Sequence, residues 1–279
     1  MSSLPHCYRH PDRETGLSCS ECGRPICTEC VTYAPVGLRC PDHSGKPQGK
    51  AKVAAAVGAR GDDFVTRALI AINVVVFLAE IATGAGFQNF GSSSLALDWA
   101  VWGPLVAAGE WWRLVTAGFI HYGVFHLLVN MYSLYLLGGS LERIMGRGRF
   151  VLLYFCSLLA GSAGAIVVSW ATPSAGASGA IFGLLGAGLV LERQRVINAP
   201  NLMGILVINL VLTFAFSSYI SVGGHIGGLI GGALMALAYS QFGRGHALYG
   251  RLGALGIAGI ALVGVGSIVL AEYAARHPF

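Results

Sequence analysis

Two polar side chains lie inside segments that contain no Asp, Glu, Lys or Arg. Ser178 lies in a Gly-Ala-Ser-Gly sequence within residues 150–191, and His225 lies in a Gly-His-Ile-Gly-Gly sequence within residues 196–243. Polar groups at bilayer depth are costly and usually face a bundle interior or a water-filled cavity. A hydroxyl can act as a nucleophile when an imidazole takes its proton. The two segments therefore suggest hydrolysis inside a membrane.

The composition indicates a membrane protein. The chain has 279 residues, of which 54% are hydrophobic and only 11% are charged, whereas soluble domains carry roughly 25% charged residues. The 40 glycines follow no fixed repeat, and small residues let helices pack closely in lipid. We therefore expect an all-α polytopic membrane fold for most of the chain.

A membrane-spanning helix needs about 20 mostly apolar residues, and seven segments approach this length. Residues 84–121 are amphipathic and too interrupted to span, so we expect them to lie in the interface. The expected spans are residues 64–83, 122–142, 150–170, 177–192, 200–217, 224–242 and 252–272.

The arginines of the connections lie mostly on one side of these spans. Cytoplasmic loops carry an excess of Lys and Arg. We therefore expect a multi-pass protein of the cell membrane, with its N-terminus in the cytoplasm and its C-terminus outside. The arginines expected on the cytoplasmic side are Arg143, Arg147, Arg149, Arg193, Arg195, Arg244 and Arg251, against Arg113 and Arg276 on the other side.

In this topology the second, fourth and sixth spans all enter from outside, and each carries polar residues near its outer end. A helix rises 1.5 Å per residue, which places four polar residues in the outer third of the bilayer: His126, Asn130, Ser178 and His225. Glycines four residues apart also let two helix backbones approach closely, although this spacing is common in membrane helices without catalytic roles. The fourth and sixth spans carry Gly179, Gly183, Gly224, Gly228 and Gly232.

These residue types assign roles in acyl transfer. His225 can take the proton of the Ser178 hydroxyl during attack on a carbonyl and later return it to the leaving amine. We find no Asp or Glu at the same depth to orient His225, which indicates a dyad rather than a triad. An oxyanion needs hydrogen-bond donors. The candidates are the Ser178 backbone N–H, the Asn130 amide and a His126 ring N–H.

Together the motifs resemble the rhomboid family of intramembrane serine proteases, over about residues 62–272. The resemblance rests on the Gly-Ala-Ser-Gly sequence, the sixth-span histidine followed by Gly228 and Gly232, and a second-span His-x-x-x-Asn. It implies a serine endopeptidase that cleaves single-span membrane proteins in the lipid bilayer. It further implies a Ser178–His225 dyad, the oxyanion donors named above, and a six-helix core that is followed here by one C-terminal helix.

Five further residues belong to this resemblance. It implies that Phe182, one turn after the serine, packs against the histidine of the sixth span. We expect Arg113 to anchor the first loop through hydrogen bonds to carbonyl groups. We expect Glu142 to tie the inner end of the second span to its neighbours. The other two residues are Trp112, in the first loop, and His121, five residues before the second-span histidine.

The N-terminal 45 residues contain four pairs of metal-ligand residues, and two residues separate the members of each pair. Pairs with this spacing can hold a single metal ion, and four pairs suffice for two tetrahedral zinc sites. Disulfide bonds are the alternative, but they are rare in the cytoplasm and leave the two histidines unexplained. The pairs are Cys7/His10, Cys19/Cys22, Cys27/Cys30 and Cys40/His43.

This spacing resembles B-box-type zinc domains. The resemblance implies an interleaved arrangement, in which the first and third pairs bind one ion and the second and fourth pairs bind the other. Pairing in sequence order is the alternative. A module this small could hardly fold without metal, so the zinc would be structural, and catalysis needs no cofactor. Residues 1–52 hold seven Lys/Arg against five Asp/Glu, too small a positive excess for nucleic-acid binding. We therefore expect a docking or regulatory module with a cytoplasmic protein partner.

The chain thus divides into a zinc-binding domain at residues 1–45, a basic flexible linker at residues 46–61 and a transmembrane domain at residues 62–279. Two other functions stay open. A rhomboid-like scaffold without catalysis could bind membrane proteins in quality control. A transporter would need paired ionisable groups near the midplane, where this sequence offers Gly, Ala, Leu and Val.

Overall fold

A computed structural model describes six stretches of the chain: residues 4–33, 37–44, 63–84, 93–199, 201–240 and 252–278. The chain divides into two compact units, Met1–Gly61 and Asp62–Phe279. The linker expected at residues 46–61 lies outside the described residues, and so do Arg244 and Arg251.

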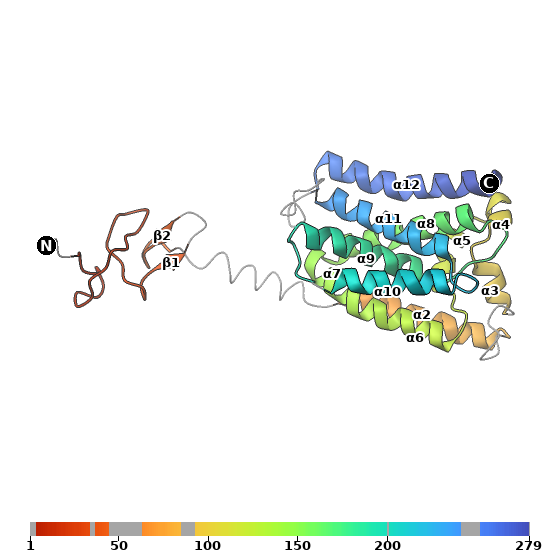
Figure 1. Ribbon diagram of the computed structural model, residues 1–279, viewed down its shortest axis with the longest axis horizontal. Helices are drawn as coiled ribbons and strands as arrows, with labels where there is room; N and C mark the ends of the chain where they lie inside the picture. The colour runs from red at the N-terminus through yellow and green to blue at the C-terminus, as the bar shows by residue number, and fades with distance from the viewer. Residues whose placement is uncertain are drawn as a thin grey trace. The chain divides into compact units, whose positions relative to one another are not determined.

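The described part of the N-terminal unit consists mostly of turns rather than of long elements (Figure 1). Strands β1 (Thr32–Tyr33) and β2 (Leu38–Arg39) pair antiparallel. Apart from the buried Ile26, the buried cluster of this unit consists of cysteines. So small a core supports folding only with help from metals or disulfides. The described cysteines form no disulfide.

The second unit is a bundle of long helices (Figure 1). Among the described residues, five helices are long and apolar enough to cross a membrane: α2 (Phe64–Ala82), the continuous helix Val124–Met145, α8 (Arg147–Val168), α11 (Val222–Tyr239) and α12 (Ala254–Arg276). The continuous helix consists of α6 (Val124–Ser133), the π-helical turn η3 (Leu134–Gly138) and α7 (Gly139–Met145).

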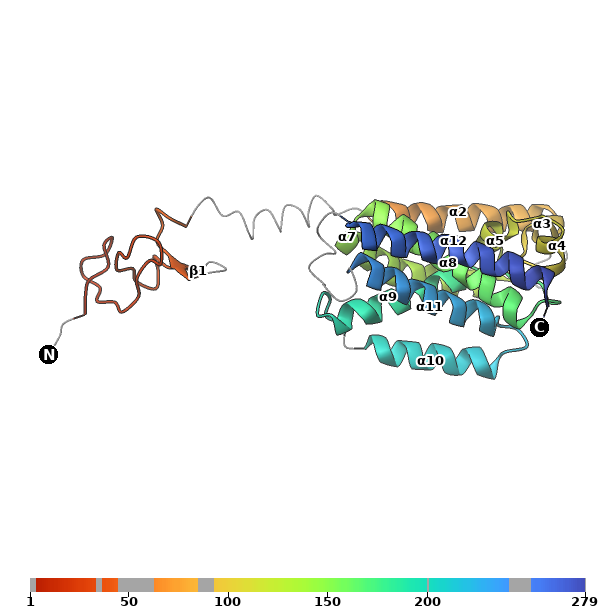
Figure 2. The same cartoon turned by 90° about the horizontal axis from the view of Figure 1, so that it is seen from above.

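The other two expected spans are helical but shorter. Helix α9 (Ser178–Arg193) has 16 residues and α10 (Leu202–Ala215) has 14, so they rise by only about 24 Å and 21 Å. Most of α9 is buried among its neighbours, whereas α10 lies at the edge of the bundle (Figure 2). All seven expected spans are therefore helices, with ends shifted by a few residues.

The centre of the bundle is formed by α8, α9 and α11, and α12 packs along α8 and α11 (Figure 1). The outer helices expose large apolar side chains, among them Val75 of α2, Val211 of α10 and Leu262 of α12. Extensive exposed apolar surface marks a region that contacts a membrane or a partner. This surface is consistent with the multi-pass membrane fold expected from the composition.

Short helices build the first loop at one end of the bundle, the end at which α12 finishes (Figure 1). The buried Arg113 donates hydrogen bonds to the carbonyl oxygens of Leu97 at 2.7 Å and Ala100 at 3.0 Å, and it pairs with Glu110 at 2.6 Å. Arg113 thus anchors the loop through carbonyl groups. The loop elements are α3 (Ser94–Trp99), α4 (Gly103–Ala107), α5 (Arg113–Thr116) and η2 (Ala117–Phe119).

Glu142 lies in α7, at the opposite end of the bundle (Figure 1). Its carboxylate accepts hydrogen bonds from the backbone N–H groups of Val65, at 2.9 Å, and Thr66, at 2.8 Å, and also from the Thr66 hydroxyl at 2.8 Å. The first N–H groups of a helix lack partners within it, and a negative charge there is favourable. Glu142 therefore ties the second span to the start of α2.

Helices α9 and α11 cross with their backbones in contact. A Cβ atom added to Gly228 would overlap the carbonyl oxygen of Gly179, and one added to Gly232 would overlap the carbonyl oxygen of Gly183. These are the small residues from which close approach was expected. Because the crossing starts at the first turn of α9, it brings the start of α9 next to the start of α11.

Candidate active site and metal centres

Ser178 is the first residue of α9. The N–H groups of a helix's first turn have no intrahelical partner and carry the positive end of the helix dipole. The preceding loop is fixed by two reciprocal hydrogen bonds between Val101 and Ser174, both 2.9 Å, and by one from Gly176 N–H to the Ala117 carbonyl at 2.9 Å. The half-buried serine therefore has a defined position, and its backbone N–H has no hydrogen-bond partner among the residues that the structure describes.

Gly176 brings the serine and a histidine together. Its φ is +126°, a conformation that residues with a side chain rarely adopt. A Cβ at this position would lie 2.9 Å from Nε2 of His126 and 3.6 Å from Oγ of Ser178. The His126 ring and the Ser178 hydroxyl therefore flank the same glycine, and only a glycine fits between them.

The hydrogen bonds of His126 define which ring nitrogen carries its proton. The backbone N–H of Tyr122 donates to His126 Nδ1 at 3.3 Å, so in the neutral ring the proton lies on Nε2. Nε2 is the nitrogen that faces Gly176. Asn130, one turn further along α6, uses one amide hydrogen on the His126 carbonyl at 3.0 Å and keeps the second. Both side chains therefore retain a donor.

His225 lies in the first turn of α11 and is buried. Its ring stacks on Phe182, with centroids 3.9 Å apart and planes inclined by 19°. Phe182 is one turn after Ser178 on α9, so the stack holds the imidazole at the serine end of that helix. No hydrogen bond joins the Ser178 hydroxyl to His225 within the described parts of the chain; instead, Nδ1 of His225 pairs with the Thr213 hydroxyl at 2.7 Å.

A small cavity of about 20 Å³ adjoins Ser178, and Gly118, Ser162 and Ser221 are among the residues that line it. This volume accommodates about one water molecule. The site therefore combines a hydroxyl, an imidazole, several N–H donors and room for water.

His121 lies beside His126, whereas Trp112 belongs to the first loop. His121 is fully buried, and its ring centroid is 5.1 Å from that of His126. Its backbone N–H donates to the buried Glu80 of α2 at 3.2 Å. Trp112 is exposed in the first loop. The His121 ring therefore packs against the ring of His126.

Two residues that contact histidines of this site were not predicted from the sequence, namely Glu80 and Thr213. Glu80 is the single acidic residue within the first expected span, and that isolation was a usable signal. Thr213 gave no signal, because a threonine in an apolar helix is ordinary.

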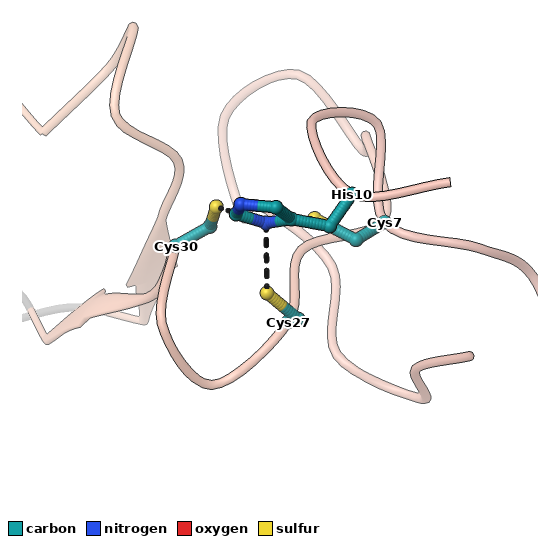
Figure 3. Close-up of side chains that lie close together, drawn as sticks. All are labelled: Cys7, His10, Cys27 and Cys30. Carbon is teal, nitrogen blue, oxygen red and sulfur yellow. Dashed lines mark hydrogen bonds between the residues drawn. The ribbon is translucent and has the colours of Figure 1, made fainter. Parts of the chain in front are cut away.

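In the N-terminal unit, the eight expected ligands form two groups, and within each group all ligand atoms lie within 4.8 Å of one another. This is the interleaved arrangement rather than pairing in sequence order. Figure 3 shows the first group, in which the His10 ring lies beside Cys27 and Cys30. The groups are Cys7, His10, Cys27 and Cys30, and Cys19, Cys22, Cys40 and His43.

The distances within these groups fit zinc. Two sulfur atoms bound tetrahedrally at about 2.3 Å from one zinc ion lie about 3.8 Å apart, and Sγ of Cys22 lies 3.8 Å from Sγ of Cys40. Nδ1 of His10 lies 3.4 Å from the sulfur of Cys27 and 3.3 Å from that of Cys30. Three cysteines and one histidine per group are a common structural zinc set.

Hydrogen bonds within these groups favour the thiolate, which is the form of cysteine that binds metal. Burial acts to raise the pKa of Cys7, but hydrogen bonds from the backbone N–H groups of Arg9 and Cys27 and from the His10 side chain outweigh it and lower that pKa to about 6. Burial likewise opposes backbone hydrogen bonds at Cys19, whose pKa is also lowered to about 6. Each group therefore contains a cysteine whose pKa lies below its ordinary value.

Comparisons with known proteins agree with this fold. A family model described as "Rhomboid domain" matches residues 108–242. The chain is 40% identical over 199 residues to Rhomboid protease GluP of Bacillus subtilis, an alignment that covers 69% of this chain and 38% of that protein. It is 39% identical over 142 residues to Putative rhomboid protease YdcA of the same organism, with 49% of this chain and 71% of that protein covered.

A further relative is Rhomboid protease GlpG of Photorhabdus laumondii, 29% identical over 179 residues, with 62% of this chain and 60% of that protein covered. The chain therefore spans less than two thirds of the length of GluP and GlpG, and more than two thirds of YdcA.

Proposed function

The chain belongs to the rhomboid family, and we propose that it is an intramembrane serine endopeptidase in which Ser178 is the nucleophile and His225 the general base. The observation that carries the proposal is the meeting of three elements at one point. The start of α9 carries the serine, α11 presents the stacked histidine, and α6 presents His126 across Gly176.

The chemistry follows from these positions. Nε2 of His225 takes the proton of the Ser178 hydroxyl while Oγ attacks the scissile carbonyl carbon, and it then gives that proton to the leaving amine. Water next attacks the acyl-enzyme, again with His225 as base, which releases the acid product and restores the serine. The negative oxygen of each tetrahedral intermediate receives hydrogen bonds from the Ser178 N–H, Nε2–H of His126 and the second amide hydrogen of Asn130.

Substrates in this proposal are single-span membrane proteins. The carbonyl groups of a helix are hydrogen-bonded within it, so a span must unwind locally before the serine can attack, and helix-breaking residues favour this unwinding. Sequences near the ends of spans, or with Gly or Pro within them, are therefore the expected targets.

The site would open toward the outer face of the membrane, with the N-terminus in the cytoplasm. Support comes from the arginines near the bundle end opposite the site: Arg143, Arg147, Arg149, Arg193 and Arg195. Positive residues favour the cytoplasmic side. In sealed spheroplasts, a protease added outside should leave the N-terminal unit intact. Digestion of the N-terminal unit under those conditions would show that the protein has the opposite orientation in the membrane.

The N-terminal unit would hold two structural zinc ions, each bound by three cysteines and one histidine. Structural zinc provides the folding free energy that so small a core lacks. We propose that the folded module binds a cytoplasmic protein partner. A pull-down that retains partners with the intact module, but not with a chelator-treated one, tests this role.

The decisive experiment is cleavage of a single-span reporter in membranes. Ser178→Ala and His225→Ala should each abolish cleavage and labelling by a fluorophosphonate, while Ser140→Ala, an exposed serine on α7, should preserve both. All variants should accumulate to the same level. Full cleavage by Ser178→Ala would refute the proposal. A wild-type protein that binds reporters but neither cleaves them nor reacts with the probe would be a non-catalytic scaffold.

A further inference from the structure

Thr213 makes two hydrogen bonds through a single hydroxyl. Its Oγ1 lies 2.7 Å from the carbonyl oxygen of Asn209, one turn earlier on α10, and 2.7 Å from Nδ1 of His225 on α11. The Thr213 side chain is buried, with 1% of its surface exposed. The contact therefore forms away from solvent and links two different helices at the catalytic histidine.

Counting protons decides the direction of both bonds. A carbonyl oxygen can only accept, and a threonine hydroxyl has a single proton to donate. The bond to Asn209 uses that proton, so the bond to His225 must run from the ring to the hydroxyl. Nδ1 of His225 therefore carries the ring proton, and Nε2 of the neutral ring carries the lone pair.

We propose that Thr213 is a positioning residue for catalysis, which holds His225 in the tautomer and orientation that make Nε2 the base for Ser178. This inference rests on the proposed function. The tautomer of a histidine is set by the partner of its other nitrogen, and Thr213 supplies that partner where other serine hydrolases use a carboxylate. Phe182 stacks on the face of the same ring. The stack therefore sets the plane of the imidazole, and the hydrogen bond to Thr213 sets the rotation of the ring within that plane.

The competing explanation is structural. Threonine hydroxyls often bond the carbonyl four residues earlier, and the contact with His225 could merely join α10 to α11. The two explanations differ in what they predict for the reactivity of Ser178 in folded protein. A positioning role requires slower reaction of the serine without the hydroxyl, whereas a structural role changes only stability.

Three substitutions separate the hydroxyl from the shape of the side chain. Thr213→Val keeps the shape and loses the hydroxyl. Thr213→Ser and Thr213→Ala both lose the methyl group, and only the serine keeps the hydroxyl. Val211→Ala, on the exposed side of α10, is the control for changes to this helix. The measurements are kcat and KM for a reporter peptide in detergent, the rate of Ser178 labelling by a fluorophosphonate, and the thermal unfolding midpoint.

We expect Thr213→Val to lower kcat and the labelling rate by about tenfold to 100-fold, the range found when partners that orient metal-bound histidines are removed, with KM nearly unchanged. Thr213→Ser should react at least several times faster than Thr213→Ala at equal folded fraction. Equal labelling rates for the serine and alanine variants would overturn the inference, and this comparison decides the matter even if the valine variant misfolds. If wild-type protein shows no Ser178-dependent labelling, the proposed function fails instead.

Discussion

At the scale of single residues, Gly176 combines two constraints that no other residue type satisfies. Its φ is +126°, and an added Cβ would lie 2.8 Å from Cε1 of His126. Either constraint alone could be relieved by a small shift. Together they mean that a side chain at this position must displace the loop, the His126 ring or the serine that follows two residues later.

Gly176→Ala should therefore abolish most of the proposed activity without unfolding the protein. Displacement of a catalytic group by about 1 Å can cost 100-fold in rate, so we expect cleavage and fluorophosphonate labelling to fall by about that factor. The matched control is Gly148→Ala, because nothing lies within 4 Å of a Cβ at that helical position. A Gly176→Ala enzyme with wild-type kinetics would show that the loop geometry is not required.

The residues of the candidate site differed in how far sequence alone could identify them. Polar residues are rare within apolar spans, so sequence alone could single out four candidates, and helix periodicity predicted their common depth. These candidates are Ser178, His225, His126 and Asn130. Sequence alone could not identify Thr213 as a candidate. Its hydroxyl can satisfy itself within its own helix, so only the packing of α10 on α11 shows that it also contacts a histidine.

At the scale of elements, the crossing of α9 and α11 decides where the two residues of the proposed dyad lie. The glycine spacing predicted close approach, and the structure places the backbones in contact at Gly179, Gly183, Gly228 and Gly232. The span expected at residues 177–192 has the same 16-residue length as α9, whereas the span expected at residues 200–217 is longer than α10. Phe216 continues the apolar run beyond the C-terminal end of α10, so hydropathy could not show that this helix has only 14 residues.

Gly232→Ala should separate these helices, because the new Cβ would overlap the backbone of Gly183. Overpacking of this kind typically costs about 1–3 kcal/mol. We expect a lower thermal unfolding midpoint in detergent and, because the same crossing positions the dyad, a parallel loss of cleavage. Gly266→Ala on α12 is the control, since a Cβ there meets no atom within 4 Å. If both variants unfold at the wild-type temperature, close packing at Gly232 does not contribute to stability.

At the scale of the whole molecule, two units with different sources of stability share one chain. The membrane unit buries helices against one another, whereas the N-terminal unit has a core made largely of cysteines that are candidate metal ligands. Sequence spacing singled out all eight candidate ligands but left both the interleaved and the sequential pairing open, because the spacing within a pair does not show which other pair lies beside it. Only the fold of the turns selects the interleaved groups.

Double substitutions measure this pairing directly in the full-length protein. Cys7 and Cys30 belong to one group, whereas Cys7 and Cys22 belong to different groups. Elemental analysis should find about two zinc ions per wild-type chain, about one in Cys7→Ala/Cys30→Ala and none in Cys7→Ala/Cys22→Ala, because a group with two or three protein ligands binds zinc far more weakly than a complete set of four. Pairing in sequence order would exchange the last two results. Cys156→Ala, in the membrane unit, should retain both ions, and a zinc-free wild-type protein would exclude the metal sites altogether.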